Sequence, residues 1–464
     1  MADTDFDVVV LGAGPAGENA AGRAADHGLR VAIVEPELIG GECSYWGCIP
    51  SKTLLRPGDV VAAARRVPGA AAAVSGAIDV DAAFARRTYM TSDWDDTSQV
   101  PWLDSKKIAL FRGHGRLAGE RRVTVEHADG STQTLTAGRA VVLATGTFSF
   151  QPPIPGLGDV RAWDNRGATA ATAVPPRLLV LGGGAVGVEM AQAFRRLGST
   201  EVTVVEGADR LLAREEPFAG AEVQAAFAAE GIRVVTGQAV TAVSRDGDDT
   251  VHATLADGTR IDADELLVAV GRRPSTTDIG LDTVGLEPGR AVDVDDRLRA
   301  RGVAGRWLYA VGDVNGRAPL THMGKYQARI AGDVIAGRDI TDIASEAVVP
   351  RVTFTDPQVC AVGLTEAQAR ERGLAVRTVS YGTGDVAGAY TQGEGIAGTS
   401  FLVVDTDREV IVGATFTGPA VAELLHSATV AIVGEVPMSR LWHAVPSFPT
   451  VSEVWLRLLE TYGL

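Results

Sequence analysis

The sequence predicts an α/β protein in which two similar strand–helix–strand units come before a separate α+β region. Each unit has an apolar strand, a glycine-rich turn, an amphipathic helix and a second strand ending in glutamate, over residues 7–35 and 178–206. Such units are typical of Rossmann-like dinucleotide-binding domains. Between the two units, the pattern predicts a helix from Pro57 to Ala64 and strands at 132–135 and 140–147. From about residue 346 onward, strand-like runs alternate with helices, which indicates a third, α+β domain.

The composition argues against several classes of function. The formal net charge of -15 would repel a nucleic acid, so we expect no nucleic-acid partner. The first residues are acidic, whereas a secretory signal begins with basic ones, and no window approaches 18 uninterrupted apolar residues. We therefore expect a cytoplasmic protein with no membrane segment.

The first glycine-rich turn carries Gly12, Gly14 and Gly17 in a GxGxxG pattern. The first glycine permits the tight turn, the second lets the backbone approach a pyrophosphate, and the third allows close helix–strand packing. The phosphate would lie at a helix N-terminus, where free N–H groups favour an anion. Glu35 follows Gly12 by 23 residues and is placed to accept a hydrogen bond from a ribose hydroxyl. A glycine turn without a ligand is the weaker interpretation.

The second glycine-rich turn carries Gly182, Gly184 and Gly187, and Glu206 closes its second strand. An acid at this position accepts from the 2′-hydroxyl of a ribose and repels a 2′-phosphate. The sequence therefore favours NADH over NADPH. Arg210 lies nearby and could weaken that preference.

Two of the three cysteines lie close together in one short segment. Cys43 and Cys48 are separated by four residues and can close a small disulfide at the start of a helix, with Lys52 nearby. A thiolate at a helix N-terminus near a cation has a lowered pKa, which suits thiol–disulfide exchange. The alternative is a pair of buried structural cysteines. No further ligands for a zinc ion lie near, so we expect no metal, and Cys360 is expected to be a buried free thiol.

These features give the sequence a resemblance to the pyridine nucleotide-disulfide oxidoreductases, which include dihydrolipoamide dehydrogenase, glutathione reductase and mercuric reductase. The resemblance covers essentially the whole chain. Its motifs are both glycine turns, the CxxxxCxPSK segment that ends at Lys52, ATG at 144–146, Glu189, VGRRP at 270–274, GD at 312–313 and FTDPQVCAVGLTE at 354–366.

The resemblance implies an FAD-binding domain at 1–148 and 276–345, an NAD(P)H-binding domain at 149–275 and a dimerisation domain at 346–464. It implies a homodimer, since relatives complete each active site with the C-terminal domain of the partner. The residues implied to bind the cofactors are Gly12, Gly14, Gly17, Glu35, Lys52, Thr145, Gly146, Gly182, Gly184, Gly187, Glu206, Gly271, Gly312 and Asp313.

The resemblance also implies roles in the reaction. Asp313 would hydrogen-bond the ribityl chain of FAD. Lys52 and Glu189 would pair beside the flavin N5. Cys48 would face the flavin, and Cys43 would attack the substrate.

One departure from the family pattern affects the chemistry. Relatives carry His-Pro-Thr with a glutamate five residues after the histidine, whereas this chain has Phe448 at the histidine position and keeps Glu453. Phenylalanine cannot transfer a proton, so the usual acid–base group is absent. His443 lies five residues upstream, does not match the spacing and is interpreted as a structural or rim histidine.

The same Phe replaces the histidine in 2-ketopropyl-coenzyme M oxidoreductase/carboxylase. The likeness to that enzyme is partial, because there the glutamate is changed too. Three functions therefore stay open for a small-molecule acceptor: electron transfer from nicotinamide through flavin and the Cys43–Cys48 pair to a disulfide, reduction of a quinone or metal ion, and carbon–sulfur bond cleavage. A non-enzymatic flavoprotein that serves only as a binding subunit is disfavoured, because the cysteine pair and both glycine motifs are intact.

Overall fold

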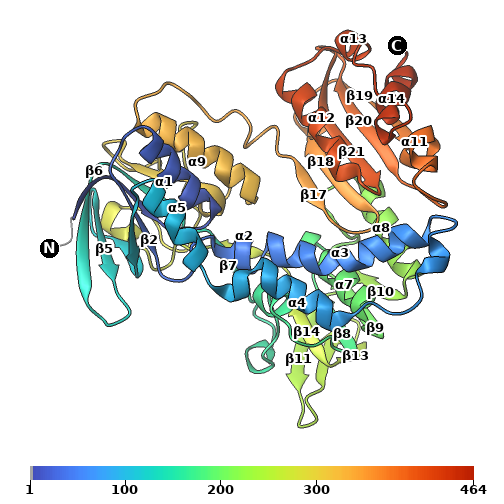
Figure 1. The fold of residues 1–464 in the computed structure, drawn as a ribbon, viewed down its shortest axis with the longest axis horizontal. Helices are drawn as coiled ribbons and strands as arrows, with labels where there is room; N and C mark the ends of the chain where they lie inside the picture. Colours follow the sequence, from blue (N-terminus) through green and yellow to red (C-terminus); the bar gives the residue numbers. More distant parts are fainter. Residues whose placement is uncertain (1–3) are drawn as a thin grey trace. The chain divides into compact units, whose positions relative to one another are not determined.

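The computed structural model describes residues 4–464 and forms two compact units (Figure 1). Unit 1 contains the chain up to Pro50, together with Thr88–Phe150 and Gly271–Glu346. Unit 2 contains Ser51–Arg87, Gln151–Val270 and Ala347–Leu464. The second unit thus combines the predicted NAD(P)H-binding and C-terminal domains with a helical segment, 51–87, that was predicted to belong to the first domain. The predicted domain boundaries stay a prediction.

A seven-stranded sheet forms the centre of unit 1. Its order is β3-β2-β1-β6-β5-β4, with β16 pairing beside β6. The strands are β1 (Asp5–Leu11), β2 (Val31–Glu35), β3 (Ala109–Arg112), β4 (His114–Leu117), β5 (Arg122–Glu126), β6 (Thr132–Leu143) and β16 (Leu308–Ala310). The central strands pair in parallel. Their continuous apolar runs are buried on both faces, as in a sheet covered on each side.

Two helices of unit 1 pack side by side although they are far apart in sequence (Figure 1). They are α1 (Pro15–Asp26) and α9 (Thr321–Ile335). Arg23 of α1 and His27, which directly follows α1, contact Asp333 of α9 at 2.8 and 2.6 Å. The remaining elements are α2 (Gly41–Tyr45), α5 (Val100–Ser105), β7 (Thr147–Ser149), β15 (Arg272–Pro274) and the 3₁₀ helices η2 (Ser92–Trp94), η3 (Thr97–Gln99), η5 (Leu281–Val284) and η6 (Gly312–Asn315).

The first part of unit 2 repeats the parallel arrangement on a smaller scale. Its sheet has the order β10-β9-β8-β14, and a three-stranded antiparallel sheet follows. The strands are β8 (Arg177–Leu181), β9 (Glu201–Glu206), β10 (Ile232–Thr236), β11 (Val240–Arg245), β12 (Val251–Leu255), β13 (Arg260–Ala263) and β14 (Glu265–Val268). The helices are α3 (Cys48–Arg65), which begins in unit 1, α4 (Val80–Met90), α6 (Asn165–Thr169), α7 (Ala185–Leu197), α8 (Pro217–Ala229), η1 (Ala71–Ala73) and η4 (Leu157–Asp159).

The C-terminal part of unit 2 is an antiparallel sheet of five strands in the order β17-β18-β21-β20-β19 (Figure 1). The strands are β17 (Arg351–Thr353), β18 (Gln358–Gly363), β19 (Val376–Gly382), β20 (Thr399–Asp405) and β21 (Val410–Gly418). The helices are α10 (Glu366–Glu371), α11 (Ala387–Tyr390), α12 (Val421–Val433), α13 (Met438–Leu441), α14 (Val454–Tyr462), η7 (Thr383–Asp385) and η8 (Val451–Glu453). Helix α12 packs on β18 and β21, and α14 packs on β19 and β20.

Two elements differ from the sequence-based expectation. A helix was expected from Pro57 to Ala64, but α3 begins at Cys48 and contains Pro57 in its interior. Buried Leu54 and Leu55 hold the helix in place despite the amide hydrogen that proline lacks. The predicted strand 132–135 and the first part of the predicted strand 140–147 form one strand, β6, which ends at Leu143. Its first half pairs with β5 and its second half with β1 and β16.

Within residues 4–464, none of the helices combines the length and the apolar character needed to cross a membrane.

Candidate active site

The first glycine turn joins β1 to α1 in unit 1. Gly12 has φ +96°, and a Cβ there would lie 2.5 Å from the carbonyl oxygen of Ala144. A Cβ on Gly17 would lie 1.9 Å from the Gly12 oxygen, so both positions require glycine. A Cβ on Gly14 would meet nothing within 4 Å. The turn is therefore tightly packed on one side and presents open backbone on the other, which fits a pyrophosphate at the start of α1.

Glu35 stabilises this turn through hydrogen bonds to backbone amides. Its buried carboxylate accepts hydrogen bonds from the amides of Ala13 at 2.7 Å and Glu37 at 2.8 Å. Burial raises the pKa of Glu35, while these amides and the Arg112 guanidinium lower it in part. The carboxylate therefore fixes the turn, and its contact with a ribose stays a prediction.

Asp313 is the second residue of the 3₁₀ helix η6 and hydrogen-bonds to Thr147 of β7. The Thr147 hydroxyl donates to Asp313 at 2.8 Å, and Arg272 Nε donates to the same hydroxyl oxygen at 2.8 Å. Burial raises the pKa of Asp313. The Thr145 hydroxyl donates to the Ser275 carbonyl at 2.8 Å. A half-buried acceptor at this place fits the predicted hydrogen bond to a ribityl hydroxyl.

The remaining predicted glycines of unit 1, Gly146, Gly271 and Gly312, all have positive φ values, of 69°, 133° and 75°. Gly146 and Gly271 flank the β7–β15 pair at opposite ends, and Gly312 is the first residue of η6. These glycines let the chain turn close to Asp313.

Both cysteines of the pair lie in unit 1, Cys43 within α2 and Cys48 as the first residue of α3. Cys43 and Cys48 are half-buried, and Cys48 Sγ lies 3.3 Å from the Thr321 hydroxyl at the start of α9. A hydrogen bond with Cys48 and burial raise the pKa of the Cys43 thiol, whereas Thr321 and the charge of Lys325 oppose the rise. Cys360 is fully buried in β18, as expected.

Lys52 and Glu189 form an ion pair in unit 2, with 2.6 Å between Lys52 Nζ and Glu189 Oε2. Glu189 is buried, and its other oxygen accepts from the Phe354 amide at 2.9 Å. Lys52 Nζ also lies 4.9 Å from the centre of the Phe354 ring. Lys52 follows Cys48 by one turn of α3, so the helix that begins with one thiol also carries the ion-paired lysine.

The second glycine turn, between β8 and α7, is braced in the same way as the first. Glu206 accepts from the amides of Gly183 at 2.5 Å and Ala208 at 2.7 Å. A Cβ on Gly187 would lie 1.9 Å from the Gly182 oxygen, and Gly184 again has nothing within 4 Å. The two turns therefore share one local design.

Arg210, which could have weakened a preference for NADH, has other partners in this structure. Its guanidinium donates to the carbonyls of Leu212, Ala213 and Glu215 at 3.0, 2.7 and 2.9 Å. It therefore holds the loop after β9, and three of its hydrogen bonds would compete with a 2′-phosphate.

The segment with the missing histidine lies in the C-terminal part of unit 2. The side chain of Phe448 is 75% exposed and His443 is also exposed, whereas Glu453 is buried. Glu453 Oε1 accepts from Arg457 at 2.7 Å. Its other oxygen is buried and has no hydrogen-bond partner among the described residues. The spacing of four residues between Glu453 and Arg457 could have revealed this ion pair from the sequence, but it was missed.

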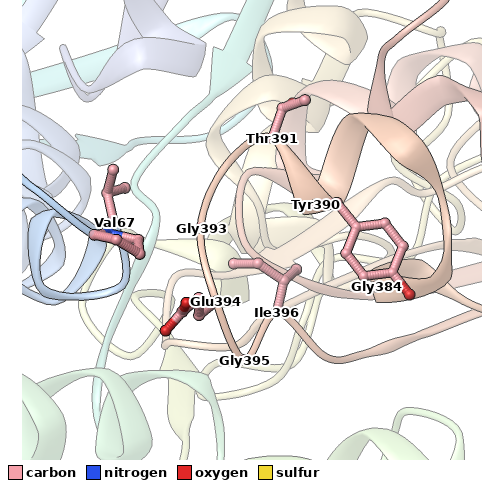
Figure 2. Close-up of a pocket in the computed structure, with 9 residues that line it drawn as sticks. Val67, Gly384, Tyr390, Thr391, Gly393, Glu394, Gly395 and Ile396 are labelled. Carbon is pink, nitrogen blue, oxygen red and sulfur yellow. The ribbon is translucent and has the colours of Figure 1, made fainter.

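A cavity of about 500 Å³ lies apart from all predicted site residues, within unit 2 (Figure 2). It lies between the segment after α3 and the loop before β20, and its lining includes Val67, Tyr390, Glu394 and Ile396. Glu394 is its only charged lining residue. Across residues 4–464 there is also no group of three or more His, Cys, Asp or Glu side chains that could hold a metal ion.

Comparison with known proteins decides the family. The model of the pyridine nucleotide-disulphide oxidoreductases matches residues 6–328, and the model of their dimerisation domain matches residues 349–458. The chain belongs to this family. Dihydrolipoyl dehydrogenase of Chlamydia muridarum is 32% identical over 97% of this chain and 95% of its own length. Mercuric reductase of Bacillus cereus is 30% identical over 97% of this chain and 70% of its own length.

Solved structures of the family have the same fold. LpdA of Mycobacterium tuberculosis superposes with a TM-score of 0.87 at 26% identity over the full length of both chains. The Cu(II) complex of the HOCl-induced flavoprotein disulfide reductase RclA of Escherichia coli has a TM-score of 0.86 at 25% identity over 99% of both chains.

Membership of the family confirms the predicted fold class and cofactors. The protein is an enzyme, a flavin-dependent pyridine nucleotide-disulfide oxidoreductase that uses FAD and NAD(P)H. Its C-terminal domain is of the kind through which the family dimerises, which supports the predicted homodimer. The identity of the electron acceptor and the roles of individual residues are proposed below.

Proposed function

We propose that this enzyme passes electrons from NADH to the Cys43–Cys48 pair and from there to a small-molecule disulfide. The observation that carries the proposal is the placement of one thiol in α2, Cys43, and the other at the first residue of α3, Cys48, which contacts Thr321 of α9. The first glycine turn and Asp313 would hold FAD, which would supply the two-electron chemistry that links the nicotinamide to the disulfide. The predicted location is cytoplasmic.

The dithiol then carries out the exchange. The Cys43 thiolate attacks one sulfur of the acceptor, which breaks the acceptor's disulfide and forms a mixed disulfide, and the leaving thiolate takes a proton from solvent. The Cys48 thiolate attacks Cys43 Sγ, closes the Cys43–Cys48 disulfide and releases the second thiol. Two electrons thus leave the dithiol, and the acceptor gains two electrons and two protons.

The preference for NADH is supported by the second glycine turn. The Glu206 carboxylate lies beside the open backbone of the turn, and Arg210 is bound to three carbonyls. A 2′-phosphate would meet an anion there. Lys52 is proposed to stand beside the flavin N5, with its ammonium oriented by Glu189.

A second candidate function is the reduction of a quinone or metal ion. Phe448 favours it, because an acceptor that takes electrons without a thiol leaving group has no need of the missing acid–base group. Two relatives have names consistent with such acceptors: a mercuric reductase, and a disulfide reductase solved as a Cu(II) complex.

A comparison of acceptors separates the two functions. NADH oxidation is measured under nitrogen with a small disulfide, a quinone and a divalent metal ion, in the wild type and in Cys43→Ser. The proposal predicts disulfide turnover that Cys43→Ser abolishes. If the enzyme reduces only the quinone, and Cys43→Ser does so at the wild-type rate, the second function replaces the first.

A further inference from the structure

Three elements of unit 1 meet around the cysteine pair. The amide of Gly40 donates to the Ala13 carbonyl at 2.8 Å, and a Cβ on Gly41 would lie 2.8 Å from Gly14 Cα. The start of α2 is therefore held against the N-terminus of α1. A Cβ on Gly324 would lie 3.3 Å from Ala16 Cβ, so the start of α9 also packs on the first turn of α1. Residues near these three ends are brought close together.

One face of α9 connects the thiols to α1. Thr321, which contacts Cys48, and Lys325 are four residues apart in this helix and so lie on the same face. Lys325 also directly follows Gly324, the point of contact with α1. The charge of Lys325 lowers the pKa of both the Cys43 thiol and the Glu18 carboxyl, each of which burial raises.

Glu18 is the acid in the first turn of α1. Burial raises its pKa to about 7, with Glu35 of β2 adding to the rise and Lys325 opposing it. Burial, Asp96 and Glu18 raise the pKa of the Tyr45 phenol in α2 to about 12. Tyr45 therefore stays neutral near pH 7, and Glu18 is the group in this cluster that changes charge there.

Cys43 needs a cation to become a nucleophile. Its thiol pKa is raised by the hydrogen bond with Cys48 and by burial, and the residue that would act as its base in relatives is replaced by Phe448. Among the groups that act on Cys43, Cys48 opposes ionisation while Thr321 and Lys325 favour it.

We propose that the Lys325 ammonium promotes ionisation of the Cys43 thiol in place of the missing histidine, and that the Glu18 carboxylate sets how much of that charge the thiol feels. Lys325 acts here as a positioning residue that stabilises the thiolate. The inference rests on the proposed attack by Cys43. It predicts that removal of the Lys325 charge and removal of the Glu18 charge have opposite effects on the reactivity of Cys43, which a purely structural role would not give.

The sign of the effect depends on pH. Below about pH 6 Glu18 is protonated and neutral, so the thiol feels the full charge of Lys325. Above about pH 8 Glu18 is an anion that offsets this charge and makes the thiol harder to ionise. A plot of log reactivity against pH should therefore rise, flatten near pH 7 and rise again in the wild type, and should rise without the inflection in Glu18→Gln.

The test measures alkylation of Cys43 by iodoacetamide in the NADH-reduced holoenzyme under nitrogen, from pH 5.5 to 9, with fragment mass spectrometry to separate Cys43 from Cys48. The thiolate attacks carbon and iodide leaves, so the rate follows the thiolate fraction. Lys325→Met should slow alkylation about threefold at pH 7, because loss of a nearby opposite charge disfavours the thiolate. Glu18→Gln should speed it about threefold at pH 8.5 and leave it unchanged at pH 5.5.

Two controls make the result specific. Lys325→Arg keeps the charge and should stay near the wild-type rate. Arg329→Met removes an exposed cation one turn further along α9 and should change the rate less than about twofold, because exposed charges are screened. An unchanged rate in Lys325→Met, or a Glu18→Gln profile that keeps the inflection, would overturn the proposal. If Lys325→Met does not fold, the Glu18→Gln profile decides.

The alkylation assay contains no electron acceptor, so it tests the role of Lys325 independently of the proposed disulfide reductase activity. Predicted alkylation profiles together with absent disulfide turnover would leave the role of Lys325 intact and reject the disulfide as acceptor. Normal disulfide turnover together with an unchanged alkylation rate in Lys325→Met would reject the role of Lys325 and keep the disulfide as acceptor.

Discussion

Substitution of Phe448 by histidine should create a better disulfide reductase. General acid–base catalysis contributes about 10²–10⁴-fold to a rate. The structure retains part of the required arrangement, since one oxygen of the Glu453 carboxylate is buried without a hydrogen-bond partner among the described residues. That oxygen can accept from an imidazole N–H and orient it. Its other oxygen is engaged by Arg457 at 2.7 Å, which reduces the charge available to a new imidazolium.

We therefore expect a discounted gain, of about tenfold in disulfide turnover, equivalent to about 1.4 kcal/mol of transition-state stabilisation. The assay is the steady-state reduction of a small disulfide by NADH under nitrogen, with stopped-flow bleaching of the flavin measured in parallel. Bleaching by NADH should stay nearly unchanged, because the new imidazole acts on the thiols and not on the nicotinamide.

Two variants control for other causes of a gain. Phe448→Leu shortens the exposed side chain without adding a base and should give no gain. Glu453→Gln in the Phe448→His background should remove most of the gain, since the orienting carboxylate is lost. The reasoning is refuted if the wild type already turns over small disulfides at the rates of its relatives, if Phe448→His slows them, or if Phe448→Leu gives the same gain. His443 would then be the next residue to replace.

Three further predictions follow from the cofactor sites and the core. The purified protein should be yellow with about one FAD per chain by absorbance, and Asp313→Ala should lower this ratio; a colourless protein that FAD cannot reconstitute would contradict the site. NADH should reduce the flavin faster than NADPH in stopped-flow experiments, and Glu206→Ala should narrow the ratio, whereas a wild type that prefers NADPH would show that a cation dominates the pocket. Burial alone would raise the pKa of Asp356, but its hydrogen bonds with Arg196, at 2.8 Å, and with Arg66 lower it overall. Asp356→Asn should thus lower the free energy of unfolding in urea by about 3 kcal/mol at pH 7. The difference in unfolding free energy between wild type and variant should shrink as the pH falls below about 4, where the carboxylate of the unfolded chain is protonated. An equal difference at pH 7 and pH 3 would contradict the role of the Asp356 charge.

The parts of the fold that the sequence predicted are those encoded in short segments. A strand, a glycine turn, a helix and a closing glutamate follow one another within about 30 residues, so both units could be recognised from local pattern. The helix α3 was predicted too short, because Pro57 is a local signal against helix and the packing of Leu54 and Leu55 that overrides it is not local.

The site was predicted less completely. The positions of Glu35 and Glu206 were identified, but their hydrogen bonds to the turn amides depend on side-chain geometry that spacing does not show. Lys52 and Glu189 were paired only through the resemblance, since 137 residues separate them. The proximity of Glu18 to Lys325 had no sequence signal, because it depends on how α1 and α9 pack.

The most direct test of the central claim is an anaerobic titration with NADH or dithionite, followed by absorbance. If the cysteine pair is redox-coupled to the flavin, the wild type should take up about four electrons per chain, two for the flavin and two for the disulfide. Cys43→Ser and Cys48→Ser should each take up about two, and Cys360→Ser, which alters a fully buried thiol in β18, should behave as the wild type. A wild type that stops at about two electrons would contradict the account, because the thiols would then lie outside the path of the electrons.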